Sequence, residues 1–263
     1  MTVELEKAGL NRFQKIITIA SKPPEYCEEN EEIANVAEQI LTSNHRSVTV
    51  VSGNMQLVGV ITIMDVLNFF LREGNPSEKT SSIMSRDVLF CDASDTIGFA
   101  LQKFKISRRG RFPITEKKTL VAVVTEHDIV KHFSDVDFEA TVEEVMTTKP
   151  FFVRSKFTII DCLKSIVNTR YRRLPIVGED DSISIIAAED VLKKFAEVGY
   201  NKSKLMDRVD TISIKKIFSV SKDDDISLAV KMMSDNDVGG LPVIDNKKLI
   251  GFITERDVLE EII

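Results

Sequence analysis

The sequence is poor in the features that mark membrane and secreted proteins. No segment approaches the roughly 18 consecutive apolar residues that suggest a membrane span. The first residues, Met-Thr-Val-Glu-Leu-Glu-Lys, lack an apolar stretch behind a basic head, so no leader peptide is expected. We therefore expect a cytoplasmic protein without membrane contacts.

Cysteine and histidine are scarce, with three of each in 263 residues. Cys27 and Cys91 occupy equivalent positions of an internal repeat whose later copies carry valine there. We interpret both as small buried hydrophobic residues, as opposed to a disulfide or metal pair, and Cys162 on a predicted helix in the same way. His45 and His132 have no partner at metal-ligand spacing. Neither a metal nor a cofactor is expected.

An excess of positive charge and the common catalytic motifs are also missing. Basic side chains number 35 and acidic ones 41, giving a net charge of −6. This balance argues against nucleic acid as a partner, because phosphate neutralisation needs a basic face. Nothing resembles a nucleophile with its base, a paired-carboxylate site, a CxxC pair or a phosphate loop with its lysine. We expect a protein that is not an enzyme.

What the sequence does contain is a fourfold repeat. Four apolar runs end in a small residue that is followed three positions later by an aspartate: Asp65, Asp128, Asp190 and Asp257. These aspartates are 63, 62 and 67 residues apart. A proline precedes the last three aspartates by 15 residues. The chain therefore consists of a module of about sixty residues that is repeated four times.

The elements within a repeat can be predicted from periodicity. In the second repeat, residues 88–91 form a β-prone run, and apolar residues from Ile97 to Phe104 recur at helical spacing. Residues 120–124 then predict a strand, and Thr125 opens a second helix. The fourth repeat shows the same pattern, with strands over 217–220, 241–244 and 249–253 and a helix from Glu255. The order is strand, helix, strand, strand, helix, and the fold class is α+β.

This pattern resembles the CBS domain, named after cystathionine β-synthase. The fourth repeat carries the motifs most fully, in Leu241-Pro-Val-Ile-Asp-Asn and Leu249-Ile-Gly-Phe-Ile-Thr-Glu-Arg-Asp257. A chain of four such repeats is similar to the γ subunit of AMP-activated protein kinase and its prokaryotic relatives. The resemblance implies repeats at 11–72, 82–133, 141–195 and 204–263. It also implies that the first pairs with the second and the third with the fourth, around clefts that often hold adenosine-containing ligands.

The end of each repeat has a chemistry that suits such a ligand. A hydroxyl residue that ends a strand and enters a helix leaves backbone N–H groups that favour a phosphate. An aspartate in that first turn offers two oxygens to the hydroxyls of a ribose. A small residue three positions before the hydroxyl lets a planar base approach. The candidate hydroxyls are Thr62, Thr125 and Thr254. Helix capping is the alternative explanation, because Thr-x-x-Asp is close to a capping pattern.

Basic residues lie in the loop before the proline-containing strand. By the resemblance, those that bind phosphate are Arg46, Arg111, Arg172 and Arg173. Arginine suits this role because its planar fork matches phosphate oxygens, although a solvated basic turn explains the same residues. His127 and Arg256, inside the Thr-x-x-Asp turns, either point at the same phosphate or lie on the helix surface.

The four repeats are not equivalent, because Ala187 replaces the threonine before Asp190. A lost hydrogen bond to a charged group is worth roughly 1.5–3 kcal/mol, so this site should be weakened or empty. We expect the third repeat to lend its arginines to its partner repeat's ligand. The cleft of Thr254 and Asp257 should bind most tightly.

Together these features predict a regulatory sensor that binds AMP, ADP or ATP. It would act on an unknown protein partner through a ligand-dependent arrangement of its modules. One alternative is a protein that binds S-adenosylmethionine or another adenosyl ligand. Another is a ligand-free scaffold that works through protein contacts, including a homodimer.

Overall fold

The computed structural model describes residues 2–43, 46–212 and 217–263. The chain divides into two compact units. Unit 1 comprises Met1–Pro24, Leu89–Pro150 and Phe218–Ile263, and unit 2 comprises Glu25–Val88 and Phe151–Ile217. Of the predicted repeats, unit 1 therefore contains most of the second and fourth, and unit 2 contains most of the first and third. The pairing of the first repeat with the second, and of the third with the fourth, stays a prediction.

The elements of unit 1 begin with a short N-terminal helix that lies outside the predicted repeats. In chain order they are α1 (Thr2–Lys7), η1 (Ile16–Thr18), β4 (Cys91–Asp92), α4 (Ile97–Ser107), β5 (Arg111–Glu116), β6 (Thr119–Thr125), α5 (Glu126–Val130), η3 (Lys131–Phe133), α6 (Val142–Val145), β7 (Thr147–Thr148), α9 (Ile226–Asp235), β11 (Gly240–Asp245), β12 (Lys248–Thr254) and α10 (Glu255–Ile262).

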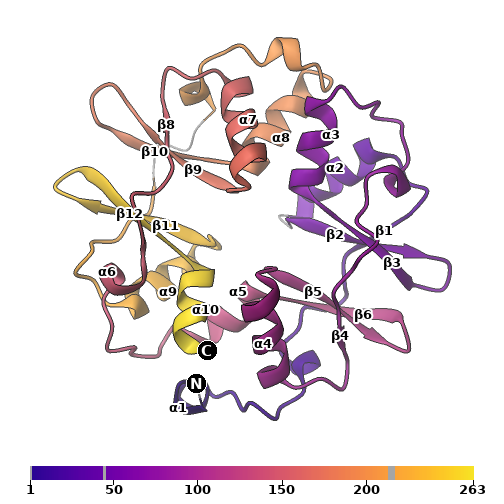
Figure 1. Ribbon diagram of the computed structural model, residues 1–263, viewed down its shortest axis with the longest axis vertical. Coiled ribbons are helices and arrows are strands. Elements are labelled where there is room, and N and C mark those ends of the chain that lie inside the picture. Colours follow the sequence, from indigo (N-terminus) through magenta and orange to yellow (C-terminus); the bar gives the residue numbers. More distant parts are fainter. Residues whose placement is uncertain (1, 44–45, 213–216) are drawn as a thin grey trace. The chain divides into compact units, whose positions relative to one another are not determined.

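Unit 2 is built in the same way. Its elements are β1 (Tyr26–Glu28), α2 (Ile33–Ser43), β2 (Ser47–Ser52), β3 (Gln56–Thr62), α3 (Ile63–Leu71), η2 (Thr80–Ser82), β8 (Val153–Arg154), α7 (Ile159–Thr169), β9 (Arg173–Val177), β10 (Ile183–Ala187), α8 (Ala188–Glu197), η4 (Lys202–Lys204) and η5 (Val209–Thr211). Figure 1 shows α5 beside α10 in unit 1, and α3 beside α7 and α8 in unit 2.

The predicted order of elements is confirmed in the first three repeats, and the mixed helix and strand fold in all four. In each repeat the two longer strands form an antiparallel hairpin. The entry strand, where present, pairs in parallel with the first of them. Three hairpins turn through two consecutive residues with positive φ, as at Asn246 and Lys247, which matches the right-handed twist of paired strands.

The entry strands are shorter than the sequence predicts. In the second repeat the strand expected over 88–91 is Cys91–Asp92, because the parallel pairing joins only Cys91 to Ile114 and Asp92 to Thr115. In the fourth repeat the strand expected over 217–220 is, among the described residues, a single bridge between Val220 and Val243. In each of these two β-prone runs, the last residue, Cys91 or Val220, is buried in the core.

Each unit has its own hydrophobic core. In unit 1 the core includes Leu5 and Leu10, from the segment before the repeats, and Ile262 at the other end of the chain. Both chain ends accordingly lie close together in this unit (Figure 1). In unit 2 the ring of Phe70 meets the ring of Phe195 edge to face, with centroids 5.9 Å apart. This contact ties α3 to α8.

The interpretation of the cysteines as buried hydrophobic residues is confirmed. Cys27, Cys91 and Cys162 are all buried and free. Burial raises the pKa of Cys27 and Cys162 to about 12 and that of Cys91 to about 11. The thiols are therefore protonated and inert near neutral pH. Among the described residues, none of the helices combines the length and apolar character needed to span a bilayer.

Candidate functional site

The candidate site starts from the threonines at the strand-to-helix junctions. Thr62 caps α3: its hydroxyl accepts from the amide of Asp65, and Asp65 Oδ2 accepts from the amide (2.8 Å) and the hydroxyl (2.7 Å) of Thr62. The same box forms between Thr125 and Asp128 and between Thr254 and Asp257. Capping is thus a real role of this motif.

The cap holds each carboxylate in a fixed orientation and leaves its other oxygen available. Among the described residues, Oδ1 of Asp65 and Oδ1 of Asp257 have no hydrogen-bond partner. A carboxylate has about four acceptor positions, and the cap takes the two on Oδ2. Both hydroxyls of a ribose would therefore have to converge on Oδ1. The sequence predicted instead that both carboxylate oxygens of the aspartate would contact the ribose hydroxyls. Burial raises the pKa of Asp257.

Asp128 differs because both of its oxygens are already engaged. The Ser21 hydroxyl donates to Oδ1 at 2.9 Å, and Lys131 Nζ reaches the same atom at 3.1 Å. Asp128 is 3% exposed. A ligand hydroxyl at this position must displace Ser21 or Lys131.

Asp190 has the weakest local support. Its Oδ2 accepts from the Ala187 amide at 2.8 Å, and Ala187 supplies no hydroxyl. Burial raises the pKa of Asp190, while the amide of Ala187 and the nearby Arg173 lower it in part. The replacement found in the sequence therefore removes one donor from this carboxylate.

The backbone amides at these helix starts are mostly used within the protein. The first helical residue of each donates to the loop before the hairpin: Ile63 to the carbonyl of Arg46, Glu126 to Gly110, Ala188 to Arg172, and Glu255 to Gly239. In the three capped helices the third amide donates to the threonine hydroxyl. A phosphate would meet the one remaining amide, on the second residue, together with side chains.

The same backbone bonds bring the basic loops to the helix starts. In the β-hairpin register Arg111 lies opposite Thr125 and Arg173 opposite Ala187. Arg46 directly precedes Ser47, which lies opposite Thr62. Arginine, junction residue and aspartate therefore converge at one end of the hairpin in the first three repeats. The fourth repeat has Gly240 opposite Thr254 and no arginine in that loop.

Comparison with known proteins identifies this architecture. The CBS domain family matches four stretches of the chain, residues 16–72, 81–135, 142–197 and 209–263. The chain belongs to the CBS domain family. It consists of four CBS repeats.

Several archaeal proteins are similar to this CBS protein. The uncharacterized protein MJ1225 of Methanocaldococcus jannaschii is 26% identical over 255 residues, which cover 86% of this chain and 91% of the relative. Its crystal structure, presented as that of a candidate archaeal homologue of γ-AMPK, has a TM-score of 0.86 at 24% identity and covers 95% of this chain and 100% of that one. This structural likeness shows a shared fold.

One further relative is similar in sequence, and one further solved structure is similar in fold. An uncharacterized 33.4 kDa protein of Thermofilum pendens is 30% identical over 155 residues, which cover 56% of this chain and 51% of the relative. The structure of an uncharacterized conserved protein from Pyrococcus horikoshii has a TM-score of 0.67 at 19% identity, covering 95% of this chain and 100% of that one.

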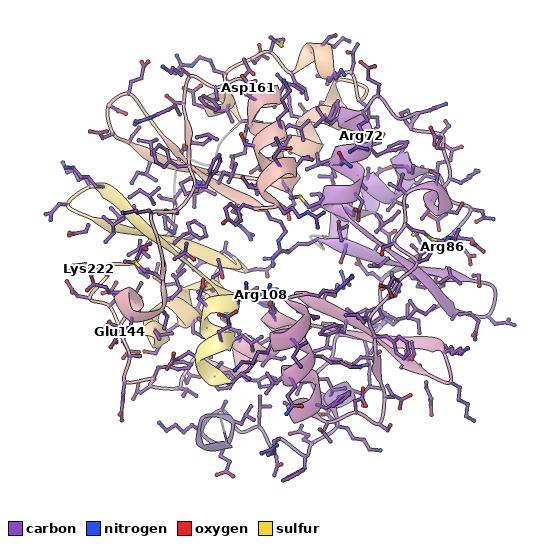
Figure 2. All side chains as sticks on the ribbon, viewed as in Figure 1. Arg72, Arg86, Arg108, Glu144, Asp161 and Lys222 are labelled. Atoms are coloured by element: carbon purple, nitrogen blue, oxygen red, sulfur yellow. The ribbon has the colours of Figure 1, made fainter. Side chains whose placement is uncertain are left out.

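His127 and Arg256 form a crossed network between the second and fourth CBS repeats. His127 Nδ1 lies 2.7 Å from Glu255 Oε1. Arg256 donates to Glu126 Oε1 through Nε at 2.8 Å and through a terminal nitrogen at 2.7 Å. Its other terminal nitrogen donates to the carbonyl of Arg108, at the C-terminal end of α4 (Figure 2). The side chains of His127 and Arg256 therefore link the second and fourth repeats within unit 1.

Both glutamates of this network are buried, with Glu126 5% and Glu255 2% exposed. The hydrogen bond to Glu255 raises the pKa of His127. Our sequence reasoning missed these glutamates. The available signal was the pair Thr125-Glu-His-Asp and Thr254-Glu-Arg-Asp, in which an acid and a base occupy matching places.

Methionine side chains fill the space beside two of the small strand residues. A Cβ at Gly59 would lie 2.6 Å from Met84 Sδ, and one at Gly251 would meet Met146 Sδ. The base of a ligand can enter here only if these side chains move, which methionine permits because it is unbranched and flexible. The sequence analysis did not identify Met84 or Met146.

A pocket of about 470 Å³ lies in unit 2 and is lined by the β9–β10 hairpin and Ser155 of the third repeat and by Arg208 and Asp210. It includes Ser184, the small residue of this repeat, but none of Arg172, Arg173 and Asp190. It therefore does not join the three parts of the candidate site.

Within the described residues no cluster of histidine, cysteine and acidic side chains could hold a metal ion. Partial burial and the adjacent Lys131 lower the pKa of His132. His45 lies outside the described residues.

Proposed function

We propose that this CBS protein binds adenine nucleotides as regulatory ligands. In this proposal the ribose hydroxyls bind Asp65, Asp257 and, after release from Ser21 or Lys131, Asp128. Asp190 binds a ribose more weakly because, without a threonine hydroxyl, the Ala187 amide alone orients its carboxylate. The threonines Thr62, Thr125 and Thr254 orient these carboxylates and do not themselves select the ligand.

The observation that carries the proposal is the convergence of three groups at one end of a hairpin. In the first repeat Arg46 supplies its carbonyl to the helix start, Thr62 caps that helix, and Asp65 keeps Oδ1 open. A cation and an oriented carboxylate at one strand-to-helix junction suit a ligand that carries phosphate and a vicinal diol.

The phosphates bind the arginines of the loops, Arg46, Arg111, Arg172 and Arg173. His127 and Arg256 reach a phosphate only if they leave Glu255 and Glu126. Because both glutamates are buried, breaking these pairs is costly. The loop arginines lie next to the helix starts in the hairpin register, so we propose them as the primary phosphate ligands and His127 and Arg256 as secondary ones.

Occupancy is passed to a protein partner through the arrangement of the CBS modules, and the chain itself performs no chemistry. A ligand can shift such an arrangement only if its affinity differs between two states. The partner thus senses which state is populated. Incubation with nucleotides followed by product analysis tests the non-catalytic part of the proposal, and we expect the nucleotides to be recovered unchanged.

Calorimetric titration with AMP, ADP, ATP and S-adenosylmethionine tests the ligand class. We expect saturable binding of the nucleotides, weakened when Arg46 or Arg111 is changed to Gln. S-adenosylmethionine carries a ribose but no phosphate, so the same substitutions should leave its weaker binding unchanged. Tighter binding of S-adenosylmethionine than of all three nucleotides would support the adenosyl-ligand alternative.

Thermal stability separates a sensor from a ligand-free scaffold. A ligand at 100 times its dissociation constant stabilises the native state by about 2.7 kcal/mol. No change in melting temperature with any of the four compounds would leave the scaffold as the better explanation.

A further inference from the structure

The outer face of α4, in unit 1, exposes large apolar side chains. Phe99 is 46% exposed and Ile106 84% exposed. They are seven residues apart, so they lie on one face of the helix about two turns, or roughly 10 Å, from each other. Phe90 adds to this face, because Lys103 Nζ lies 4.7 Å from the ring centre of Phe99 and 5.9 Å from that of Phe90.

The segment before η1 extends the same face. The amide of Gly98, near the start of α4, donates to the carbonyl of Arg12 at 2.9 Å. Phe13, next in the chain, is 76% exposed, and the guanidinium of Arg12 lies over its ring. We call Phe13, Phe90, Phe99 and Ile106 the α4 surface.

The other three repeats provide an internal comparison, because the first long helix of every repeat begins with an isoleucine in the same register. At the tenth helical position, where α4 has Ile106, the other helices have Thr42, Asn168 and Asp235. At the third position, where α4 has Phe99, they have Asn35, Asp161 and Leu228. Asp161 lies on α7 in Figure 2.

The fold therefore does not require an apolar residue at either place. Both apolar residues occur together only in the second repeat, and they project into solvent. A cluster of exposed large apolar residues of this kind typically marks an interaction site.

The helix α4 itself is positively charged, although the chain carries a net charge of −6. α4 contains two lysines and no acidic residue. By helical periodicity of about 100° per residue, Lys103 and Lys105 lie on opposite sides of the Phe99–Ile106 stripe. The charge of Lys103 is partly offset by Asp95 at 3.7 Å and by the nearby Asp92. In the described parts of the chain, Lys105 and Arg12 have no acidic partner.

We propose that the α4 surface is the docking site for an acidic amphipathic helix of a partner protein. The apolar stripe spans two helical turns, which matches the spacing of the anchors on one face of such a helix. Acidic residues beside those anchors would meet Arg12, Lys103 and Lys105. A second copy of this chain is a poorer match, because a symmetric contact would bring the same cations together.

A labelled synthetic peptide tests the proposal. The probe has about four helical turns, with leucine and phenylalanine on one face and glutamate elsewhere, and its binding to the full chain is followed by fluorescence anisotropy. We expect saturable binding that weakens with added salt, because part of the attraction is between exposed charges. A matched peptide with lysine in place of glutamate should not bind.

The chain supplies its own matched substitutions. Phe99→Asn with Ile106→Thr installs the residues that α2 carries at these positions, so the helix should still form, which circular dichroism checks. We expect this double variant to bind the acidic peptide roughly tenfold more weakly or worse. Lys105→Ser, the residue that α9 has there, should reduce the salt dependence. Leu228→Asn, the equivalent change on α9, should have no effect.

Three results would overturn the proposal. The first is absent or non-saturable binding of the acidic peptide, or binding that the double variant retains. The second is sedimentation of the wild type, but not of the double variant, with phosphatidylserine vesicles, which would assign the surface to membranes. The third is a dimer in sedimentation velocity that the double variant loses. Nucleotide affinity should be the same in all of these variants, so failure here is distinct from failure of the proposed sensor function.

Discussion

Asp257→Ala is the substitution whose effect on nucleotide binding follows most directly from the structure. The Asp257 side chain loses two roles: the cap on α10 through Oδ2 and the proposed ribose contact through Oδ1. Losing the cap costs about 1 kcal/mol of stability. Losing hydrogen bonds between the ribose and a charged acceptor costs roughly 2–3 kcal/mol of binding, or about 30- to 150-fold in affinity.

Two protein controls separate these roles in calorimetric titrations with AMP. Thr254→Ala reproduces the arrangement of Ala187 and Asp190, so it removes the hydroxyl cap but keeps the carboxylate. We expect it to cost less affinity than Asp257→Ala. Asp190→Ala should also cost less, because the third repeat already lacks a hydroxyl donor.

The ligand provides a third control. AMP should bind the wild type roughly tenfold more tightly than 2′-deoxy-AMP does, because one hydroxyl contact is lost, whereas Asp257→Ala should bind the two ligands equally. The assignment of the ribose to Asp257 would be refuted if Asp257→Ala still preferred AMP over 2′-deoxy-AMP as strongly as the wild type does. It would also be refuted if Asp190→Ala lost more AMP affinity than Asp257→Ala.

Three further expectations concern unit 1. Arg256→Ala should lower the free energy of unfolding by roughly 3 kcal/mol, because it removes two hydrogen bonds and an opposite charge from the buried Glu126; adding Glu126→Gln should recover part of this loss in urea denaturation, and no recovery would contradict the pairing. Glu255 raises the pKa of His127 in the folded protein. The contribution of this contact to the free energy of unfolding is therefore fully present below the unfolded pKa of about 6.5, and it is lost as the pH rises through the higher folded pKa. The melting-temperature difference between wild type and His127→Gln should therefore be largest in mildly acidic buffer and shrink with rising pH, and the opposite trend would count against the contact. Lys131→Asn should increase AMP affinity at the second repeat, measured by titration, because it frees one acceptor position on Asp128 Oδ1, which Ser21 still contacts; unchanged or reduced affinity would show that the lysine does not obstruct the site.

The repeats and their helix starts could be predicted because they depend on local chemistry. A threonine followed three residues later by an aspartate satisfies two backbone donors wherever a helix begins, and this determines the starts of α3, α5 and α10. Helical spacing of apolar residues likewise predicts α4. Both signals lie within about two helical turns of sequence.

The other features depend on residues far apart in the chain. Arg256 and Glu126 are 130 positions apart, and no periodicity connects them. Met84 fills the space beside Gly59 from the start of the predicted second repeat, whereas Gly59 belongs to the first. Leu5 and Leu10 enter the core of unit 1 from outside the repeats. The sequence predicted longer entry strands than the structure has, because one buried residue in a β-prone run was enough to predict a whole strand.

The central claim is that capped carboxylates at recurrent strand-to-helix junctions bind the ribose of an adenine nucleotide. A crystal structure of the protein grown with saturating AMP tests it most directly. The account predicts both ribose hydroxyls within hydrogen-bonding distance of Oδ1 of Asp65 or Asp257. A ribose bound away from all four repeat aspartates, or no bound nucleotide at all, would contradict it.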